Sequence, residues 1–254
     1  MYINKVKQAL KEGKTQLGCS VSMIRSPEVT RILAAAGLDW VYLDSEHGGF
    51  DLESLQDLAR AATDNGLCPI VRVGDVQYSL VARALDCGAQ GVLFPRVESP
   101  EILARAVSWA KFPPVGIRGF GLQATHVGYE NHTMPAVINH MNEHTMVVFQ
   151  IETQTALDRV DELVSVPGID AVMIGPADLS ISLGVPGEFE HPKMIEAIGK
   201  IRDACEKHGV APGIHVRNLK LGTYWRQSGL RFLSCNTEIG FMLESAKQHV
   251  AALR

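Results

Sequence analysis

The chain has 254 residues, 46% of them hydrophobic, and a formal net charge of -4 at pH 7. This length and composition can bury a large core, and α/β barrels of this size commonly form one domain, so we expect a single domain over 1–254. The small net charge and the lack of like-charge runs argue against nucleic acid or an anionic membrane as a partner. No apolar stretch reaches the roughly 18 residues that a membrane span needs. These features favour a cytoplasmic protein that acts on small molecules.

The cysteines are odd in number, five in all, and contain no C-x-x-C pair. Most have apolar neighbours in the sequence, as reduced thiols in a protein core usually do. The sequence therefore predicts neither a disulfide framework nor a zinc site.

Short apolar runs alternate with longer amphipathic segments along the whole chain, which is typical of strand-helix units around a parallel sheet. Eight runs have the composition of buried parallel strands, at 18–23, 40–44, 69–73, 91–95, 146–152, 171–175, 211–216 and 232–236. Helical spacing after a helix start signal marks the segments 28–36, 52–65 and 101–110. Eight such units predict an α/β fold closed as a (β/α)8 barrel of the TIM type. An open doubly wound sheet is disfavoured, because no G-x-G-x-x-G or Walker sequence follows the first run.

One segment, 116–144, does not fit this alternation. It is rich in Gly, His, Asn and Met, and only a weak helical pattern occurs near 135–141. A long irregular segment inside a compact domain is often functional, but the sequence alone does not assign its role.

Polar side chains follow five consecutive predicted strands, at the end of the barrel where active sites form. In chain order they are Asp44 with Glu46 and His47, Arg72, Arg96, Gln150 with Glu152, and Asp178. Any one of them could equally be a structural ion pair. Five strands in a row are harder to explain by structure alone, so we expect a site there.

Glu152 and Asp178 should end neighbouring strands and lie side by side. Two carboxylates so placed repel each other unless a cation or a proton joins them. Mg²⁺ or Mn²⁺ suits this pair, because both ions prefer oxygen and keep positions open for substrate. A bound 2-oxo acid could then be polarised toward an enolate, with Arg72 and Gln150 as further donors to its keto oxygen.

The segment 175–180 has the pattern of a strand-to-helix turn, which would direct the N–H groups of Ala177 and Asp178 toward a substrate carboxylate. An ordinary turn capped by Asp178 is the alternative. His47 could act as a neutral base near pH 7, although a single His after a strand is often a structural hydrogen-bonding group. No lysine closes a predicted strand, which disfavours a Schiff-base mechanism.

Ordered motifs cover nearly the whole chain: Gly37-Leu38-Asp39-Trp40, Asp44-x-Glu46-His47, Pro69-x-x-Arg72, Ala84-Leu85-Asp86-x-Gly88-Ala89, Gly116-Ile117-Arg118-Gly119, Gln150-Ile151-Glu152-Thr153 and Gly175-Pro176-Ala177-Asp178-Leu179-Ser180. Through them the chain resembles the HpcH/HpaI aldolase family, the metal-dependent class II pyruvate aldolases. The resemblance implies an aldehyde-lyase that reversibly cleaves a 4-hydroxy-2-oxo acid to pyruvate and an aldehyde. The reaction would pass through a metal-stabilised pyruvate enolate.

The resemblance also implies the roles of individual residues in the pyruvate half of the site. Glu152 and Asp178 would bind Mg²⁺, Mn²⁺ or Co²⁺, and Arg72 and Gln150 would contact the keto oxygen. The amides of Ala177 and Asp178 would hold the pyruvate carboxylate. These roles agree with those inferred from the residues themselves.

Two further implications come from the resemblance alone. His47 would work with Asp86 in proton transfer, across a boundary between subunits. The chain would form a homohexamer in which the last helix, here 246–253, is exchanged between partners.

The chain departs from the family pattern where the aldehyde would bind. Gly18-Cys19-Ser20 replaces a usual Gly-Leu-Trp, the segment 120–126 lacks the usual small and Arg-containing pattern, and His215 replaces an apolar residue. We expect His215 to reach the barrel mouth and hydrogen-bond a substrate group, with a bond to a neighbouring loop as the alternative.

Two other functions stay open. A relative could use the same enolate as a CoA-ester lyase or a decarboxylase, although no basic patch or extension for a CoA nucleotide is present. A barrel could also bind ligands without turnover, although Glu152, Asp178 and Arg72 are all retained.

Overall fold

The computed structural model describes residues 1–254 and contains a closed barrel of parallel strands in sequence order. The strands are β1 (Gln16–Val21), β2 (Trp40–Asp44), β3 (Cys68–Arg72), β4 (Gly91–Phe94), β5 (Met146–Ile151), β6 (Ala171–Ile174), β7 (Ala211–Val216) and β8 (Phe232–Thr237). Pairing of β1 with β8 closes the sheet. The predicted (β/α)8 barrel is confirmed, and all eight predicted strands occur within two residues of their expected bounds.

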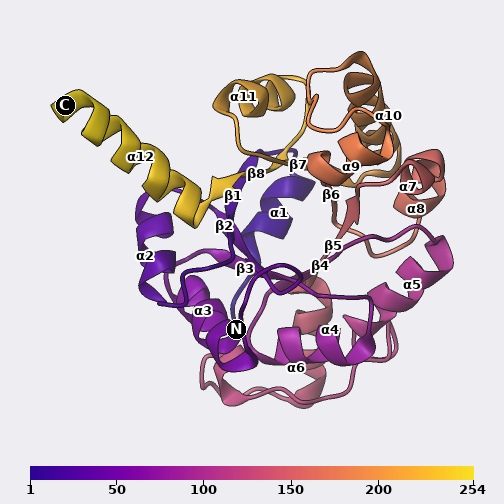
Figure 1. Ribbon diagram of the computed structural model, residues 1–254. Helices are drawn as coiled ribbons and strands as arrows, with labels where there is room; N and C mark the ends of the chain where they lie inside the picture. The colour runs from indigo at the N-terminus through magenta and orange to yellow at the C-terminus, as the bar shows by residue number, and fades with distance from the viewer.

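Most of the helices surround the barrel and connect its strands, whereas α1 lies across one end and α12 extends outward (Figure 1). They are α1 (Lys5–Lys11), α2 (Glu28–Ala35), α3 (Leu52–Asp64), α4 (Tyr78–Asp86), α5 (Pro100–Trp109), α6 (Met134–His144), α7 (Gln154–Asp158), α8 (Val160–Val164), α9 (Pro176–Ser182), α10 (Pro192–His208), α11 (Leu219–Gln227) and α12 (Glu238–Leu253). Two of the three expected start signals cap their helices, since Asp51 and Ser99 accept hydrogen bonds from the N–H groups of Ser54 and Ile102. The third, Ser26-Pro27 before α2, gives no side-chain cap. The irregular segment 116–144 contains a short 3-10 helix, Ala124–Val127, followed by α6.

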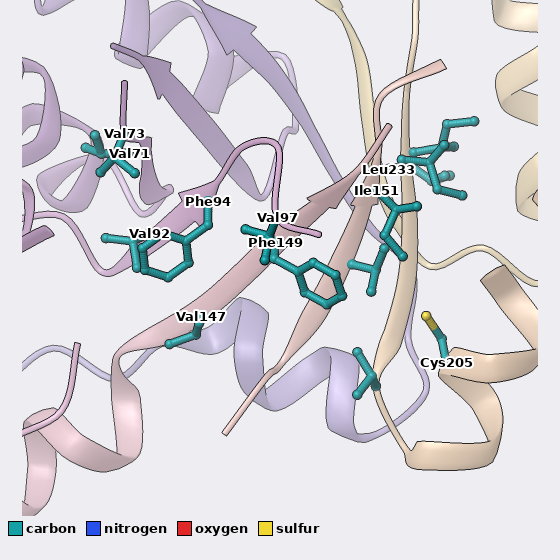
Figure 2. Close-up of a cluster of buried hydrophobic side chains, with 14 of the residues drawn as sticks. Val71, Val73, Val92, Phe94, Val97, Val147, Phe149, Ile151, Cys205 and Leu233 are labelled. Atoms are coloured by element: carbon teal, nitrogen blue, oxygen red, sulfur yellow. The ribbon is translucent and has the colours of Figure 1, made fainter. Parts of the chain in front are cut away.

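The barrel wall divides the hydrophobic core into two clusters. Because successive side chains of a strand point to opposite faces, Trp40 and Tyr42 fill the interior while Val41 packs outward against helices. The outer cluster has 49 buried residues and the inner one 13. Figure 2 shows part of the outer layer, including Phe94 and Phe149 between strands and helices. Most of the apolar burial therefore holds the helices onto the barrel.

The amino end of the barrel is closed by packed aromatic rings and by α1. The rings of Trp40 and Phe232 stack with centroids 4.0 Å apart, and Val6 of α1 joins the same cluster. A Cβ atom at Gly18 would overlap the Trp40 ring, so glycine is needed there. Access to the barrel interior is therefore from the carboxyl ends of the strands.

A buried cluster of charges lies at this closed end. The Lys111 ammonium donates hydrogen bonds to the carbonyl oxygens of Asn142 and Thr145, at 2.8 and 2.7 Å. Lys7 donates to the same Thr145 oxygen at 3.0 Å and pairs with Asp170 at 3.1 Å. Burial, reinforced by the charge of Lys7, lowers the pKa of Lys111 to about 7.

The terminal helix α12 extends away from the barrel (Figure 1). Its apolar side chains are largely exposed, among them Phe241, Met242 and Leu253. None of the helices combines the length and hydropathy required to cross a lipid bilayer. All five cysteines are free thiols, as expected from the sequence.

We predict that the buried Lys111 makes stability depend on pH. Unfolded Lys111 regains its ordinary pKa of about 10.4, so between about pH 7 and about pH 10 it binds a proton that the folded chain releases. The free energy of unfolding should therefore rise with pH in this window, by up to about 1.4 kcal/mol per pH unit. Urea unfolding near the two ends of the window measures this slope.

The Lys111→Met variant should lose this component of the slope. Lys14→Met is the matched control, because Lys14 is exposed and pairs only with Glu12. Equal slopes in the wild-type protein and Lys111→Met would contradict the prediction.

Candidate active site

A cavity of about 630 Å³ opens at the carboxyl ends of the strands. Six of the predicted site residues line it: His47, Arg72, Gln150, Ala177, Asp178 and His215. The other two, Glu152 and Asp86, do not. The structure therefore brings most of the predicted site to one place, and the two exceptions have different explanations.

The strand geometry explains why these side chains converge. Tyr42 faces the barrel interior, so Asp44, two residues further on, faces the same way at the mouth. On β3, Ile70 faces the interior, and so does Arg72 two residues later. The strand register places Asp44 directly beside Arg72. The inward-facing side chains of these strands are thus apolar inside the barrel and polar at its open end.

Arg72 is fixed by two carboxylates. Its Nε and Nη2 donate to the two oxygens of Asp44 at 2.9 and 2.6 Å, and its Nη1 lies 3.2 Å from an oxygen of Glu46. Burial raises the pKa of Asp44, but the hydrogen bonds and charge of Arg72 outweigh burial and hold that pKa below its usual range. The guanidinium is therefore a fixed positive group in the cavity wall.

Glu152 is buried directly behind this wall. Its Oε1 accepts the backbone N–H of Arg96 at 2.9 Å, and its Oε2 accepts from Gln150 Nε2 at 2.6 Å. Burial, together with the nearby charges of Glu46 and Asp178, raises the pKa of Glu152 to about 7. Two hydrogen bonds thus hold Glu152 in place, although the neighbouring negative charges disfavour its ionised form.

Gly175 permits the close approach of these groups. A Cβ atom there would lie 2.6 Å from Gln150 Nε2 and 2.7 Å from Glu152 Oε2, so any larger residue would displace both side chains. Gly175 is also the N-cap of α9, which places Asp178 in the first turn of that helix. Asp178 is therefore not the capping residue.

The donor set fits a hard divalent cation. The carboxylate of Asp178 is close enough for its charge to raise the pKa of Glu152, and Gln150 Oε1 is a buried oxygen without a hydrogen-bond partner. Oxygen donors of this kind suit Mg²⁺ or Mn²⁺. No cluster of three or more His, Cys, Asp or Glu side chains is arranged to bind a metal, so substrate or water would complete the coordination.

His47 and Asp86 are not brought together within one chain. His47 is exposed, and its Nε2 lies 3.8 Å from Glu46 Oε2. Asp86 ends α4 outside the cavity and accepts a hydrogen bond from Arg118 Nη2 at 2.8 Å. The pairing implied by the family resemblance stays a prediction that involves a second subunit.

His215 lies inside the cavity as a neutral group. It is in register with Ser234 on the neighbouring strand, and its Nδ1 is 2.8 Å from Ser234 Oγ. Its ring meets that of Tyr42 edge-on, with centroids 5.9 Å apart. Burial, and then the charge of Arg217, lowers the pKa of His215 to about 4.

Three acidic side chains shape this site in ways that the sequence did not predict: Asp44 and Glu46 were expected at the barrel mouth without a role, and Glu238 was not expected there at all. Asp44 and Glu46 anchor Arg72, and Glu238 at the start of α12 holds a loop of the cavity wall. Glu238 Oε1 accepts the N–H groups of Ser22, Met23 and Ile24, at 2.9, 2.7 and 3.1 Å. The inward parity of Asp44 and Arg72 could have revealed their pairing, whereas no local signal marks Glu238.

Comparisons with known proteins agree with this architecture. A family model described as HpcH/HpaI aldolase/citrate lyase matches residues 22–243. A 5-keto-4-deoxy-D-glucarate aldolase from Klebsiella pneumoniae is 33% identical over 99% of this chain and 96% of its own length. The crystal structure of an HpcH/HpaI aldolase from Desulfitobacterium hafniense superposes with a TM-score of 0.92 at 30% identity, covering 97% of this chain and 95% of its own. A Burkholderia cenocepacia protein of the aldolase/citrate lyase family gives 0.90 at 31% identity, covering 99% of each chain.

We predict that Glu152 is protonated near pH 6 in protein stripped of divalent ions. Difference infrared spectra between about pH 6 and about pH 8 should show a protonated carboxyl band that disappears as the pH rises, because its pKa is about 7. Adding Mg²⁺ near pH 6 should also remove the band, because a cation favours the ionised form.

Glu152→Gln should lack this band, whereas Glu162→Gln, at an exposed position of α8, should retain it. A band that persists in Glu152→Gln would assign the proton to another carboxyl group.

Proposed function

Because the chain belongs to the HpcH/HpaI aldolase/citrate lyase family and is a class II aldolase, we propose that it cleaves a 4-hydroxy-2-oxo acid reversibly to pyruvate and an aldehyde. One observation carries the proposal. A fixed guanidinium, Arg72, shares the cavity wall with Gln150 and Asp178, and Glu152 is hydrogen-bonded directly behind them. This set can neutralise negative charge that develops on a keto oxygen.

In this proposal Glu152 and Asp178 hold the metal, which can be Mg²⁺, Mn²⁺ or Co²⁺. When bound, the ion supplies Lewis-acid polarisation of the keto group. The backbone amides of Ala177 and Asp178, in the first turn of α9, hold the substrate carboxylate. The binding of a 2-oxo acid thus needs groups from both β5 and the β6–α9 turn.

Arg72 and Gln150 act on the same keto oxygen. A guanidinium has more N–H groups than the three that Asp44 and Glu46 engage, so donors remain for the substrate. Gln150 is held by Glu152, so its position does not depend on the substrate. Both donors are therefore set before the substrate arrives, which reduces the reorganisation needed as charge develops.

Cleavage also requires a base for the C4 hydroxyl. His47, at the open end of the cavity, takes this proton as the C3–C4 bond breaks and the aldehyde forms. The electron pair of that bond passes to the pyruvate fragment as its enolate, and a proton delivered to C3 completes pyruvate. In the reverse direction His47 returns the proton to the new hydroxyl. Asp86 of the partner subunit assists it within a homohexamer that exchanges its terminal helix, here 246–253.

The relatives suggest the kind of substrate. The Klebsiella pneumoniae relative is named for 5-keto-4-deoxy-D-glucarate, a 2-oxo acid with hydroxyl groups and a second carboxylate. We propose a polar substrate of this class for the present chain. His215 supports this proposal, because a neutral imidazole in the cavity wall can hydrogen-bond a substrate hydroxyl.

Removal of divalent ions tests the proposed function. EDTA treatment should abolish pyruvate release from 4-hydroxy-2-oxo acids, and added Mg²⁺ or Mn²⁺ should restore it, because no lysine is placed to replace the metal. Glu152→Gln keeps the side-chain volume and should lower turnover by on the order of 100-fold or more. Glu162→Gln serves as the control. Full turnover in the chelated enzyme would refute the metal-dependent reaction.

Substitution of His215 tests its contact with the substrate. His215→Leu should shift preference toward aldehydes without a hydroxyl, because a site that hydrogen-bonds a hydroxyl discriminates more strongly than the about 1–3 kcal/mol of an apolar pocket. The ratio of kcat/KM for hydroxylated and plain aldehydes measures this. If both values fall by the same factor, His215 has only the structural bond to Ser234.

A further inference from the structure

A second cavity, of about 210 Å³, shares no residue with the catalytic cavity. Gln90 and Thr145, which immediately precede β4 and β5, form part of its wall, so it lies near the amino ends of these strands. Helix α3 and the segment 116–144 supply much of the rest. A water molecule takes up about 30 Å³ in the liquid, so this cavity has room for several waters or for one small organic molecule.

Two oppositely charged side chains of α3 line this cavity without pairing with each other. Residues four apart on a helix lie close enough for an ion pair, yet Arg60 and Asp64 do not form one. Arg60 Nη2 donates instead to Gln123 Oε1 at 2.7 Å, and Asp64 Oδ1 accepts from the Tyr2 hydroxyl at 3.2 Å. Each charge therefore has a neutral hydrogen-bond partner and no counter-ion.

Two of the residues that line the cavity also have a buried polar atom without a partner. The Nε of Arg60 and the hydroxyl of Thr125 make no hydrogen bond within the chain. Buried polar groups in proteins usually bond to protein or to ordered water. The guanidinium of Arg60 and the hydroxyl of Thr125 can together donate to one carboxylate.

The other groups that line the cavity are neutral or already bonded. Both ring nitrogens of His126 lie within hydrogen-bond distance of backbone groups. Burial, and then the neighbouring His140, lowers the pKa of His144, so that ring is uncharged at neutral pH. Lys7, whose charge also acts on His144, pairs with Asp170 at 3.1 Å. The cavity thus presents one cation and one anion that lack counter-ions.

We propose that this cavity is a second ligand site, which binds a small zwitterion of the α-amino acid class. Arg60 and the Thr125 hydroxyl bind its carboxylate, and Asp64 binds its ammonium group. One carbon atom separates these two groups in an α-amino acid, which suits side chains that stand about one helical turn apart. A ligand with a single charge would be attracted by one of the two side chains and repelled by the other.

Saturation-transfer NMR with L-alanine tests the proposal, because this measurement detects weak binding to the whole protein. L-Lactate and L-alaninamide have nearly the same shape, but the first lacks the ammonium group and the second lacks the carboxylate. L-Alanine should bind saturably, and both analogues should bind about 10-fold or more weakly, since each loses a hydrogen bond to a charged group. Only binding that Arg60→Gln removes is counted, because a carboxylate can also enter the catalytic cavity.

Substitutions assign the binding to individual side chains. Arg60→Gln and Asp64→Asn should each weaken L-alanine binding by about 10-fold or more. Arg83→Gln and Asp57→Asn are the matched controls, because they remove the same charges from exposed positions of α4 and α3 and should leave binding unchanged. Thr125→Val removes only a hydroxyl without a partner, so it should weaken binding without lowering the thermal unfolding midpoint.

Three results would overturn the proposal. If L-alanine gives no saturable signal, the cavity does not bind this class of ligand. If L-alanine binds equally well to the wild type, Arg60→Gln and Asp64→Asn, it binds elsewhere. If L-lactate binds as tightly as L-alanine and Arg60→Gln abolishes both, the cavity is an anion site that does not recognise the ammonium group. None of these measurements uses turnover, so the aldolase proposal stands or fails separately.

Discussion

Negative charge is concentrated at the carboxyl end of this barrel, and the site is built around the need to offset it. Asp44, Glu46, Glu152 and Asp178 lie close together, and Arg72 pairs with the first two. The remaining two carboxylates have no cation from the chain. Bringing them near each other costs free energy unless a proton or a metal ion intervenes. The divalent ion that we propose at Glu152 and Asp178 would relieve this repulsion.

Close packing maintains this unfavourable arrangement. Gly175 lets Gln150 and Glu152 share a space that a methyl group would fill, and Arg96 adopts a left-handed backbone, with φ of 54°, where its N–H bonds Glu152. On the other side of the mouth, Glu238 holds the loop of Ser22 by backbone hydrogen bonds. On both sides of the mouth, a buried carboxylate therefore orders the cavity wall by accepting backbone hydrogen bonds.

The sequence predicted the barrel well because buried parallel strands are nearly continuous apolar runs. The same continuity hides which side chains point inward, so the pairing of Asp44 with Arg72 was not assigned. Helix α6 was only weakly indicated, because it buries Val137 alone and so has little apolar periodicity. Glu238 could not be found, since it bonds residues more than 200 positions away. The expected pairing of His47 with Asp86 involves two chains, which a single sequence does not place in space.

The packed aromatic rings at the amino end of the barrel restrict which residue can occupy position 18. Trp40 fills the volume that a side chain at position 18 would occupy, and its ring in turn stacks on Phe232. A side chain at position 18 would also meet the backbone carbonyl oxygen of Trp40, 2.6 Å from its Cβ atom, and no substitution at position 40 removes that oxygen. Because a packed interior has little spare volume, a smaller residue at position 40 would not by itself make room there, and β1 and β2 can lie this close only with glycine at position 18.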